Sequence, residues 1–228
     1  MPHSFLAGRS FFRARPVAVL VTAAALAFVL GARASSFDAR RPIITLGSGF
    51  YDPEKPPPPE GMIRPKPGSW DAVRPPRGYR VVLLTAGDDD PTRTLVTAVK
   101  HWGNTEHVAL RTVEVKRRDR VVDGIVEAMD LRPDLVICAG NALVDALALV
   151  TASHLDRHFL IIGAQLPEPT MNVTAAIWQG ASSRGREVPD TTSSFDPRAF
   201  TLERAGAAIR AGVASVLNDL TGIVIWLE

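Results

Sequence analysis

The part of the chain that most constrains its fold is residues 134–163, where two short apolar runs flank a stretch with helical periodicity. The runs, Leu135–Cys138 and Phe159–Ile162, are too short for helices and are typical of parallel strands that are covered on both faces. Between them, Leu143 and Leu147 recur at the spacing that places side chains on one face of a helix. The segment therefore predicts a strand, a helix and a second strand joined by a right-handed crossover.

The same alternation continues on both sides of this segment. Further strands are expected at 80–84, 108–115, 173–178 and 223–227, and further helices at 90–102, 120–131 and 200–217. Strands that alternate with helices are typical of an open α/β fold. We therefore expect residues 79–228 to form one Rossmann-like lobe, a mostly parallel sheet with helices on both faces and the first strand near its centre.

The expected ligand site lies where the predicted strands end, because open parallel sheets bind ligands outside the carboxyl ends of their strands. Three of these ends carry glycine together with polar side chains. We expect the site to be formed by Asp88, Asp89, Asp90, Gly140, Asn141, Gly163 and Gln165. The alternative for the acidic loop and for Asn141 is helix capping, with Asp90 or Thr92 capping the helix at 90–102.

The three aspartates of the loop restrict the ligand that it would hold. Their charges repel phosphate, whereas carboxylates suit hydroxyls, amines or a divalent cation. The chain contains neither GxGxxG nor GxxxxGK[ST], so no nucleotide cofactor is predicted. His154 and His158 have zinc-compatible spacing but lie outside an HExxH motif, and no nucleophile motif is present. We therefore expect a small polar ligand, no metal, no cofactor and no enzymatic activity.

Charge is distributed unevenly along the chain. Residues 1–78 hold 11 Lys and Arg against 5 Asp and Glu, whereas residues 79–228 hold 15 against 19. A nucleic-acid-binding protein concentrates positive charge on its folded domain. The opposite distribution here argues against nucleic acid as a partner.

The first 34 residues have the layout of an export signal. Arg9, Arg13 and Arg15 precede an uncharged run at 17–31, and Ala32-Arg33-Ala34 follows as a small-residue cleavage site. We expect residues 1–34 to be a signal peptide or an anchor that crosses the membrane through residues 17–32. The folded part would then be secreted or lie on the extracytoplasmic face of the cell membrane. The single cysteine, Cys138, leaves none near this segment for lipid attachment.

Residues 35–78 are rich in proline, with nine prolines between Asp52 and Pro76. Proline fixes φ and lacks a hydrogen-bond donor, so this tract is expected to be an extended, semi-rigid linker. Its function would be to hold the folded lobe away from the membrane, and recognition of Pro56–Pro59 by a partner is the alternative.

The ordered series of segments resembles the first lobe of the basic membrane protein (BMP) family, the substrate-binding proteins of nucleoside ABC importers. The resemblance rests on residues 134–150, on 159–165, on Asn172-Val173 and on 199–227. It implies a type I periplasmic-binding-protein fold, a permease partner, and a nucleoside contacted by the acidic loop at Asp89 and Asp90. The chain departs from the family at Arg93 and Thr94, which replace an aromatic and an amide residue. It also lacks the lipid-acceptor cysteine and stops before a second lobe.

Three interpretations follow for the function. The first is a substrate-binding-protein-like module that holds a small polar ligand weakly or together with a partner. The alternative is a non-catalytic cell-envelope interaction module or homo-oligomer, in which Trp178, Trp226 and the loop 180–197 form the contact surface. A Rossmann-like enzyme is a third interpretation, which no catalytic constellation in the sequence supports.

Overall fold

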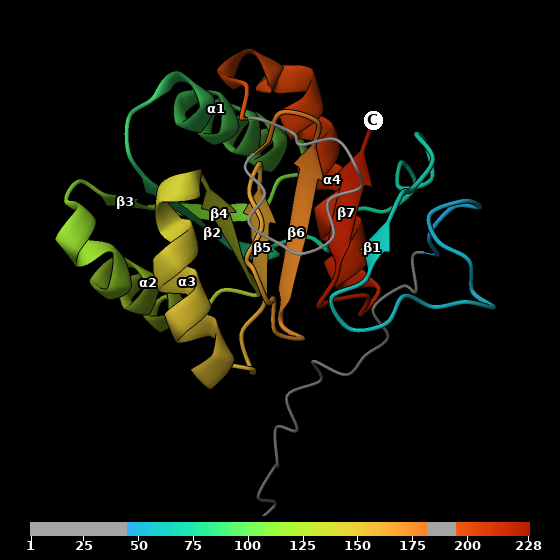
Figure 1. Cartoon of the computed structure of the whole chain (residues 1–228), viewed down its shortest axis with the longest axis horizontal. Helices are drawn as coiled ribbons and strands as arrows, with labels where there is room; N and C mark the ends of the chain where they lie inside the picture. The colour runs from blue at the N-terminus through green and yellow to red at the C-terminus, as the bar shows by residue number, and fades with distance from the viewer. Residues whose placement is uncertain (1–44, 182–194) are drawn as a thin grey trace, which may run out of the picture. The chain divides into compact units, whose positions relative to one another are not determined.

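The computed structural model describes residues 45–181 and 195–228, which belong to one compact unit, Arg40–Glu228. A wholly parallel, seven-stranded sheet runs through this unit in the order β1-β7-β6-β5-β4-β2-β3 (Figure 1). The strands are β1 (Met62–Ile63), β2 (Arg80–Ala86), β3 (Ala109–Val115), β4 (Leu135–Ala139), β5 (Phe159–Ile162), β6 (Val173–Trp178) and β7 (Val224–Leu227). The expected open, parallel α/β fold is confirmed. The expected signal or anchor at 1–34 lies outside the described residues.

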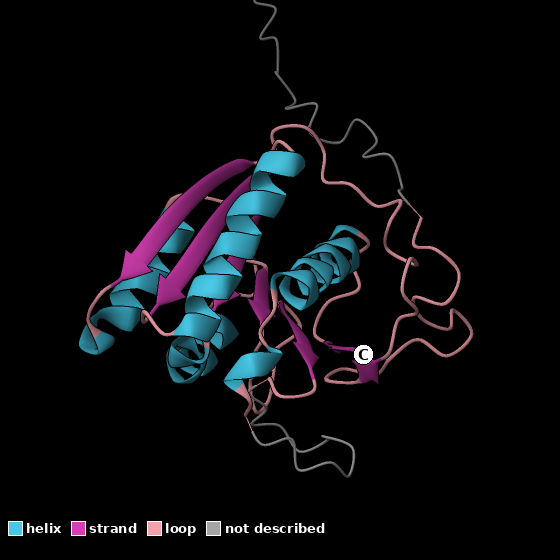
Figure 2. Cartoon of the chain, turned by 90° about the horizontal axis from the view of Figure 1, so that it is seen from above, coloured by secondary structure: helices cyan, strands magenta, loops and turns pink. Residues whose placement is uncertain are grey.

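Helices cover both faces of the sheet. They are α1 (Asp90–Thr105), α2 (Val121–Asp130), α3 (Val144–Val150) and α4 (Leu202–Leu217). Helices α1 and α4 pack together on one face, and α2 and α3 pack together on the other (Figure 2). Strands β4 to β7 are buried along their whole length, as continuous apolar runs in a doubly covered sheet require.

The position of β2 differs from the expectation that the first strand lies near the centre. In the sheet β2 lies between β4 and β3, and β3 is the edge strand. The chain passes from β2 outward to β3, then reverses, crosses back past β2 to β4, and continues in that second direction through β5, β6 and β7. This reversal makes the carboxyl ends of β2 and β4 the topological switch point of the sheet.

The expectation that residues 35–78 form an extended linker is wrong for residues 45–78, because this segment packs against the domain. Phe50, Trp70 and Val73 are buried in the same core cluster as α1 and α4, and Ile63 joins them from β1. The two residues of β1 extend the sheet beyond β7 (Figure 1). Although its prolines prevent regular structure, the large apolar side chains between them bury enough surface to dock the segment.

The connection from β5 to β6 contains no helix, and one buried side chain near its end holds it to the segment 151–157 by hydrogen bonds. The amide of Asn172 donates to the carbonyl oxygens of Thr151, His154 and Arg157 at 2.9–3.1 Å. Its Oδ1 accepts a hydrogen bond from the hydroxyl of Thr170 at 2.6 Å. With 2% of its surface exposed, Asn172 is a structural residue, and the Asn-Val-Thr sequence there is inaccessible for glycosylation.

Cys138 provides a direct probe of this core. It lies at the middle of the sheet in β4, fully buried, and burial raises the pKa of its thiol far above the ordinary value. Because the thiolate is the reactive form, we expect no reaction with an aromatic disulfide reagent while the domain is folded. Stoichiometric reaction should appear at the same denaturant concentration as the loss of circular dichroism. Rapid labelling of the native protein would show that β4 is accessible.

Candidate functional site

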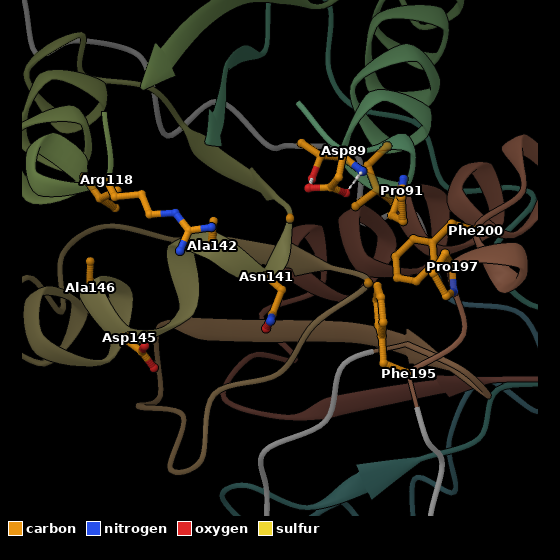
Figure 3. A pocket seen from close by; sticks show the side chains of 15 residues that line it. Asp89, Pro91, Arg118, Asn141, Ala142, Asp145, Ala146, Phe195, Pro197 and Phe200 are labelled. Atoms are coloured by element: carbon orange, nitrogen blue, oxygen red, sulfur yellow. Dashed lines mark hydrogen bonds between the residues drawn. The ribbon is translucent and has the colours of Figure 1, made fainter. Parts of the chain in front are cut away.

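A pocket of about 580 Å³ lies at the switch point of the sheet. Its lining residues come from the loop and helix after β2, from the segments after β3, β4 and β5, and from residues 195–200 (Figure 3). None of the described lining residues belongs to a strand. The volume is within the range of about 300–1,000 Å³ that small-molecule sites occupy.

Four of the predicted site residues meet in this pocket: Asp89, Gly140, Asn141 and Gly163. Gly140 and Gly163 both have a positive φ, at 107° and 71°. A Cβ atom on Gly140 would lie 2.9 Å from Oγ1 of Thr92, and one on Gly163 would lie 2.6 Å from the ring of Phe200. Glycine is therefore required at both strand ends, because the backbone turns sharply there against neighbouring pocket residues.

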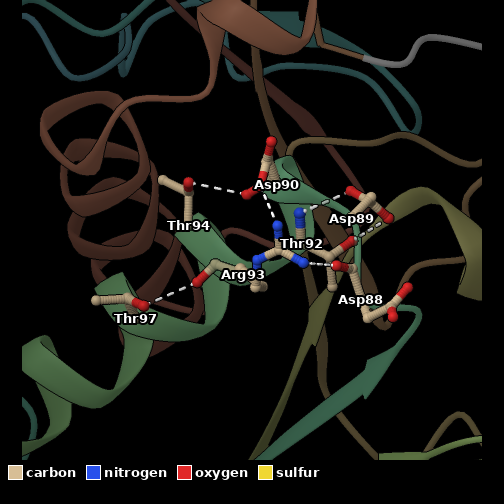
Figure 4. A network of polar contacts seen from close by, with 7 residues as sticks. All are labelled: Asp88, Asp89, Asp90, Thr92, Arg93, Thr94 and Thr97. Carbon is tan, nitrogen blue, oxygen red and sulfur yellow. Dashed lines mark hydrogen bonds and ion pairs between the residues drawn. The ribbon is translucent and has the colours of Figure 1, made fainter.

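Asp89 forms the N-cap of α1, a position that the capping alternative assigned to Asp90 or Thr92. Its Oδ1 accepts from the backbone N–H of Thr92 and its Oδ2 accepts from the Thr92 hydroxyl, each at 2.9 Å (Figure 4). Both oxygens keep further acceptor capacity, and the carboxylate remains exposed at the pocket wall. Capping and ligand contact are therefore compatible at this residue.

The other two aspartates do not line the pocket. Arg93 donates to the backbone carbonyl of Asp88 and forms an ion pair with the carboxylate of Asp90 (Figure 4). Asp90 is the first residue of α1, where its negative charge interacts favourably with the positive end of the helix dipole. Arg93, which stands where the resembled family has an aromatic residue, thus stabilises the loop on its outer side.

Gln165 also lies away from the pocket lining. Its side chain is buried, and its Oε1 has no hydrogen-bond partner among the described atoms. Of the two predicted residues after β5, Gly163 therefore contributes to the site, whereas the side-chain amide of Gln165 lies inside the protein.

Sequence reasoning missed the aromatic wall of the pocket. Phe195 and Phe200 lie with ring centroids 5.6 Å apart, and Phe200 packs edge-on against Trp178 at 5.2 Å. The indole N–H of Trp178 donates to the carbonyl of Ala199 at 2.9 Å, which fixes the turn Pro197–Ala199 that carries this wall. Trp178 is 1% exposed and Trp226 is 8% exposed, so these two tryptophans do not form the expected contact surface. Most of the loop 180–197, the third part of that surface, lies outside the described residues.

Two charged residues of the pocket were missed as well. Arg118 lies in the turn after β3, and in Figure 3 its guanidinium extends toward Asn141 and Ala142. Asp145 lies in the first turn of α3. The rule that ligands bind at strand ends applies equally to β3, and it would have included residues 116–120 in the search.

The turn that carries Arg118 is shaped by its neighbours. Arg117 donates two hydrogen bonds to Asp119, at 3.0 and 2.5 Å, and this bonding lowers the pKa of the Asp119 carboxyl. Because Arg117 is bound to Asp119, the charge that reaches the pocket from this turn is that of Arg118. Among the described residues, the pocket thus has a cation and two carboxylates on its polar side and two phenyl rings on the other.

The described ranges hold no group of three or more His, Cys, Asp or Glu that could bind a metal ion. In the same ranges no helix has both the length and the apolar character needed to cross a membrane.

Comparison with known proteins gives neither a matching family model nor a matching curated sequence. Among solved structures the chain is similar to an ABC transporter system solute-binding protein from Aeropyrum pernix K1, with 15% identity and a TM-score of 0.40 over 44% of this chain. It is also similar to a periplasmic ribose ABC transporter from Conexibacter woesei, with 16% identity and a TM-score of 0.34 over 66% of this chain. A third similar structure is a transcriptional activator of the comK gene from Bacillus halodurans, with 15% identity and a TM-score of 0.39 over 65%. The chain spans 29%, 54% and 53% of these three proteins respectively.

Proposed function

We propose that this chain is a non-enzymatic, extracytoplasmic binding module of the BMP type, which holds a small polar ligand containing a flat ring. The observation that carries the proposal is the pocket at the switch point of the sheet, where aromatic and polar walls face each other. A phenyl ring offers a stacking surface to a planar heterocycle. Asp89 and Asn141 lie just after the ends of β2 and β4. The Asp89 carboxylate can accept hydrogen bonds from hydroxyls of the ligand, and the Asn141 amide can both donate to them and accept from them.

A nucleoside combines these two requirements. Its base would stack on Phe195, which is 51% exposed and therefore free to contact a ligand. Its ribose hydroxyls would donate to Asp89, as the resemblance to the BMP family implies for the acidic loop. A phosphorylated ligand is disfavoured because the carboxylates of Asp89 and Asp145 outnumber Arg118, the single cation among the described lining residues. An ABC permease is the partner that a protein of this kind would serve.

The test is calorimetry of the full-length chain with adenosine, guanosine, inosine, uridine and free ribose. We expect saturable heat with at least one nucleoside and a weaker response to ribose alone. The variant Phe195→Ala should weaken nucleoside binding about fivefold or more, since base stacking on an aromatic side chain is worth about 1–3 kcal/mol. Asp89→Asn retains a helix-capping side chain but removes the charge, and it should weaken binding through the ribose.

The matched control is Arg111→Ala, because Arg111 is an exposed arginine on β3 that does not line the pocket, whereas Arg118 does. Arg118→Ala should change the affinity for the nucleoside, and Arg111→Ala should leave that affinity unchanged. The proposal fails if millimolar ligand produces neither heat nor a shift in the melting temperature, or if both arginine variants behave alike.

A further inference from the structure

A second pocket, of about 740 Å³, lies at the same edge of the sheet but at the carboxyl ends of β1 and β7. It is formed by residues 64–71, by the outer face of α4 with its N-cap Thr201, and by residues 226–228. It shares no lining residue with the first pocket. The turn Pro197–Ala199 runs between the two, with Pro197 bordering the first and Arg198 the second.

Positive charge converges on this second pocket from two separate segments. Arg64 and Lys66 follow β1, and Arg204 and Arg210 project from α4. Within 45–181 and 195–228, none of these four side chains forms an ion pair. Arg198 also lines the pocket, but it is bound to Asp196 at 3.0 Å.

The acidic side chains of the described lining are fewer than these cations and are not paired with them. Asp71, Glu203 and Glu228 belong to the lining, yet none of them comes within ion-pair distance of the four. Unpaired guanidinium and ammonium groups around a concave surface concentrate anions there.

Two tryptophans, Trp70 and Trp226, belong to the lining of this pocket. The guanidinium of Arg64 lies over the ring of Trp226, 5.4 Å from its centroid. Trp70 packs edge-on against Phe50 at 6.5 Å, and its indole N–H has no hydrogen-bond partner among the described atoms. A guanidinium held over a ring by a cation–π contact keeps its N–H groups available for the oxygens of an oxyanion.

We propose that this second pocket binds a multivalent oxyanion of the phosphate class. The planar donors of Arg64 and Arg210 suit bidentate contacts with phosphate oxygens. Arg204 donates one N–H to the Ala199 carbonyl at 3.5 Å and offers its remaining donors, and Lys66 adds a point charge. A multivalent anion suits the site because its four cations outside ion pairs outnumber the three acidic side chains of the described lining. The phosphate belongs either to a free small molecule or to a phospholipid headgroup. The proposal uses none of the residues of the nucleoside site and stands apart from it.

The first experiment titrates the full-length chain with inorganic pyrophosphate at 0.15 M salt and follows tryptophan fluorescence and heat. We expect a saturable response with a dissociation constant below about 1 mM, because multiple charge-assisted contacts survive screening at this ionic strength. Arg210→Ala and Lys66→Ala should each raise that constant about tenfold or more, since a hydrogen bond to a charged group is lost. Both side chains are exposed, so melting temperatures should stay unchanged.

A second arm measures co-flotation of the same proteins with vesicles of phosphatidylglycerol or of phosphatidylcholine. Flotation that requires phosphatidylglycerol and is lost in Arg210→Ala assigns the phosphate to a lipid headgroup. Pyrophosphate binding without such flotation assigns it to a free molecule. The control is Arg111→Ala, which removes an exposed arginine from β3 and should leave both responses intact. The proposal is overturned if neither arm gives saturable binding, or if Arg111→Ala reduces binding as much as Arg210→Ala.

Discussion

A chain that begins at Tyr79 is expected to lose its stable fold, whereas a chain that begins at Arg40 retains it. The shorter chain lacks Phe50, Ile63, Trp70 and Val73, which are buried in the core cluster with α1 and α4. Burying one such side chain stabilises a fold by about 1.5–3 kcal/mol. Their combined contribution is comparable with the total stability of a typical domain, about 5–15 kcal/mol, although the ordering of residues 45–78 offsets part of it.

The truncation also removes the partner of a buried strand. Residues 62–63 pair with Val224 and Ile225 of β7, and without them this apolar edge would face solvent. Exposed apolar strand edges promote aggregation. Thermal unfolding by circular dichroism and binding of an apolar dye would compare the two chains. Trp70→Ala in the full-length chain should reproduce part of the loss, about 3–5 kcal/mol. Equal melting temperatures for the two chains would show that residues 45–78 are dispensable.

Gly140→Val is expected to destabilise the domain by roughly 3–5 kcal/mol and to distort the first pocket. Gly140 has φ 107° and ψ 152°, a region that is essentially restricted to glycine. A Cβ atom there would also contact the Thr92 hydroxyl at 2.9 Å, which is the group that Asp89 binds at the N-cap of α1. The backbone strain at residue 140 and the disturbed N-cap of α1 therefore affect the same part of the pocket, around Asp89 and Thr92.

The matched control for this prediction is Gly206→Ala in α4. A Cβ atom on Gly206 meets nothing within 4 Å, and alanine in a helix is more favourable than glycine by about 0.5–1 kcal/mol. Urea unfolding should therefore show opposite signs for the two substitutions, with similar m-values. If Gly140→Val left the unfolding midpoint unchanged, the strand end would be free to adopt another conformation.

The sequence predicted most strands because their signal is local. Phe159–Ile162 and Val173–Trp178 match the structure residue for residue, since each apolar run is bounded by polar residues or turns. Strand β1 was not predictable in this way, because two residues in a proline-rich tract carry no periodicity and their pairing depends on β7. The large aromatic residues of that tract, Phe50 and Trp70, were the available sign that it is docked.

The candidate site was predictable only in part, for a related reason. Its strand-end glycines follow from topology, but the choice among three successive aspartates depends on the exact turn of the chain, which selects Asp89 as the cap. Phe195 and Phe200 reach the pocket from a segment that is distant in sequence, and a tertiary hydrogen bond from Trp178 positions them. No local pattern reports such a contact.

The absence of strand residues from the described lining of the first pocket has a consequence for how this protein can change. Its most exposed lining side chains, among them Arg118, Asn141 and Phe195, stand on turns whose replacement leaves the buried sheet untouched. Residues that specify a ligand and residues that hold the domain together therefore form nearly separate sets. Natural variation or laboratory selection could thus exchange one ligand for another through a few substitutions, while the parallel sheet remains a constant scaffold.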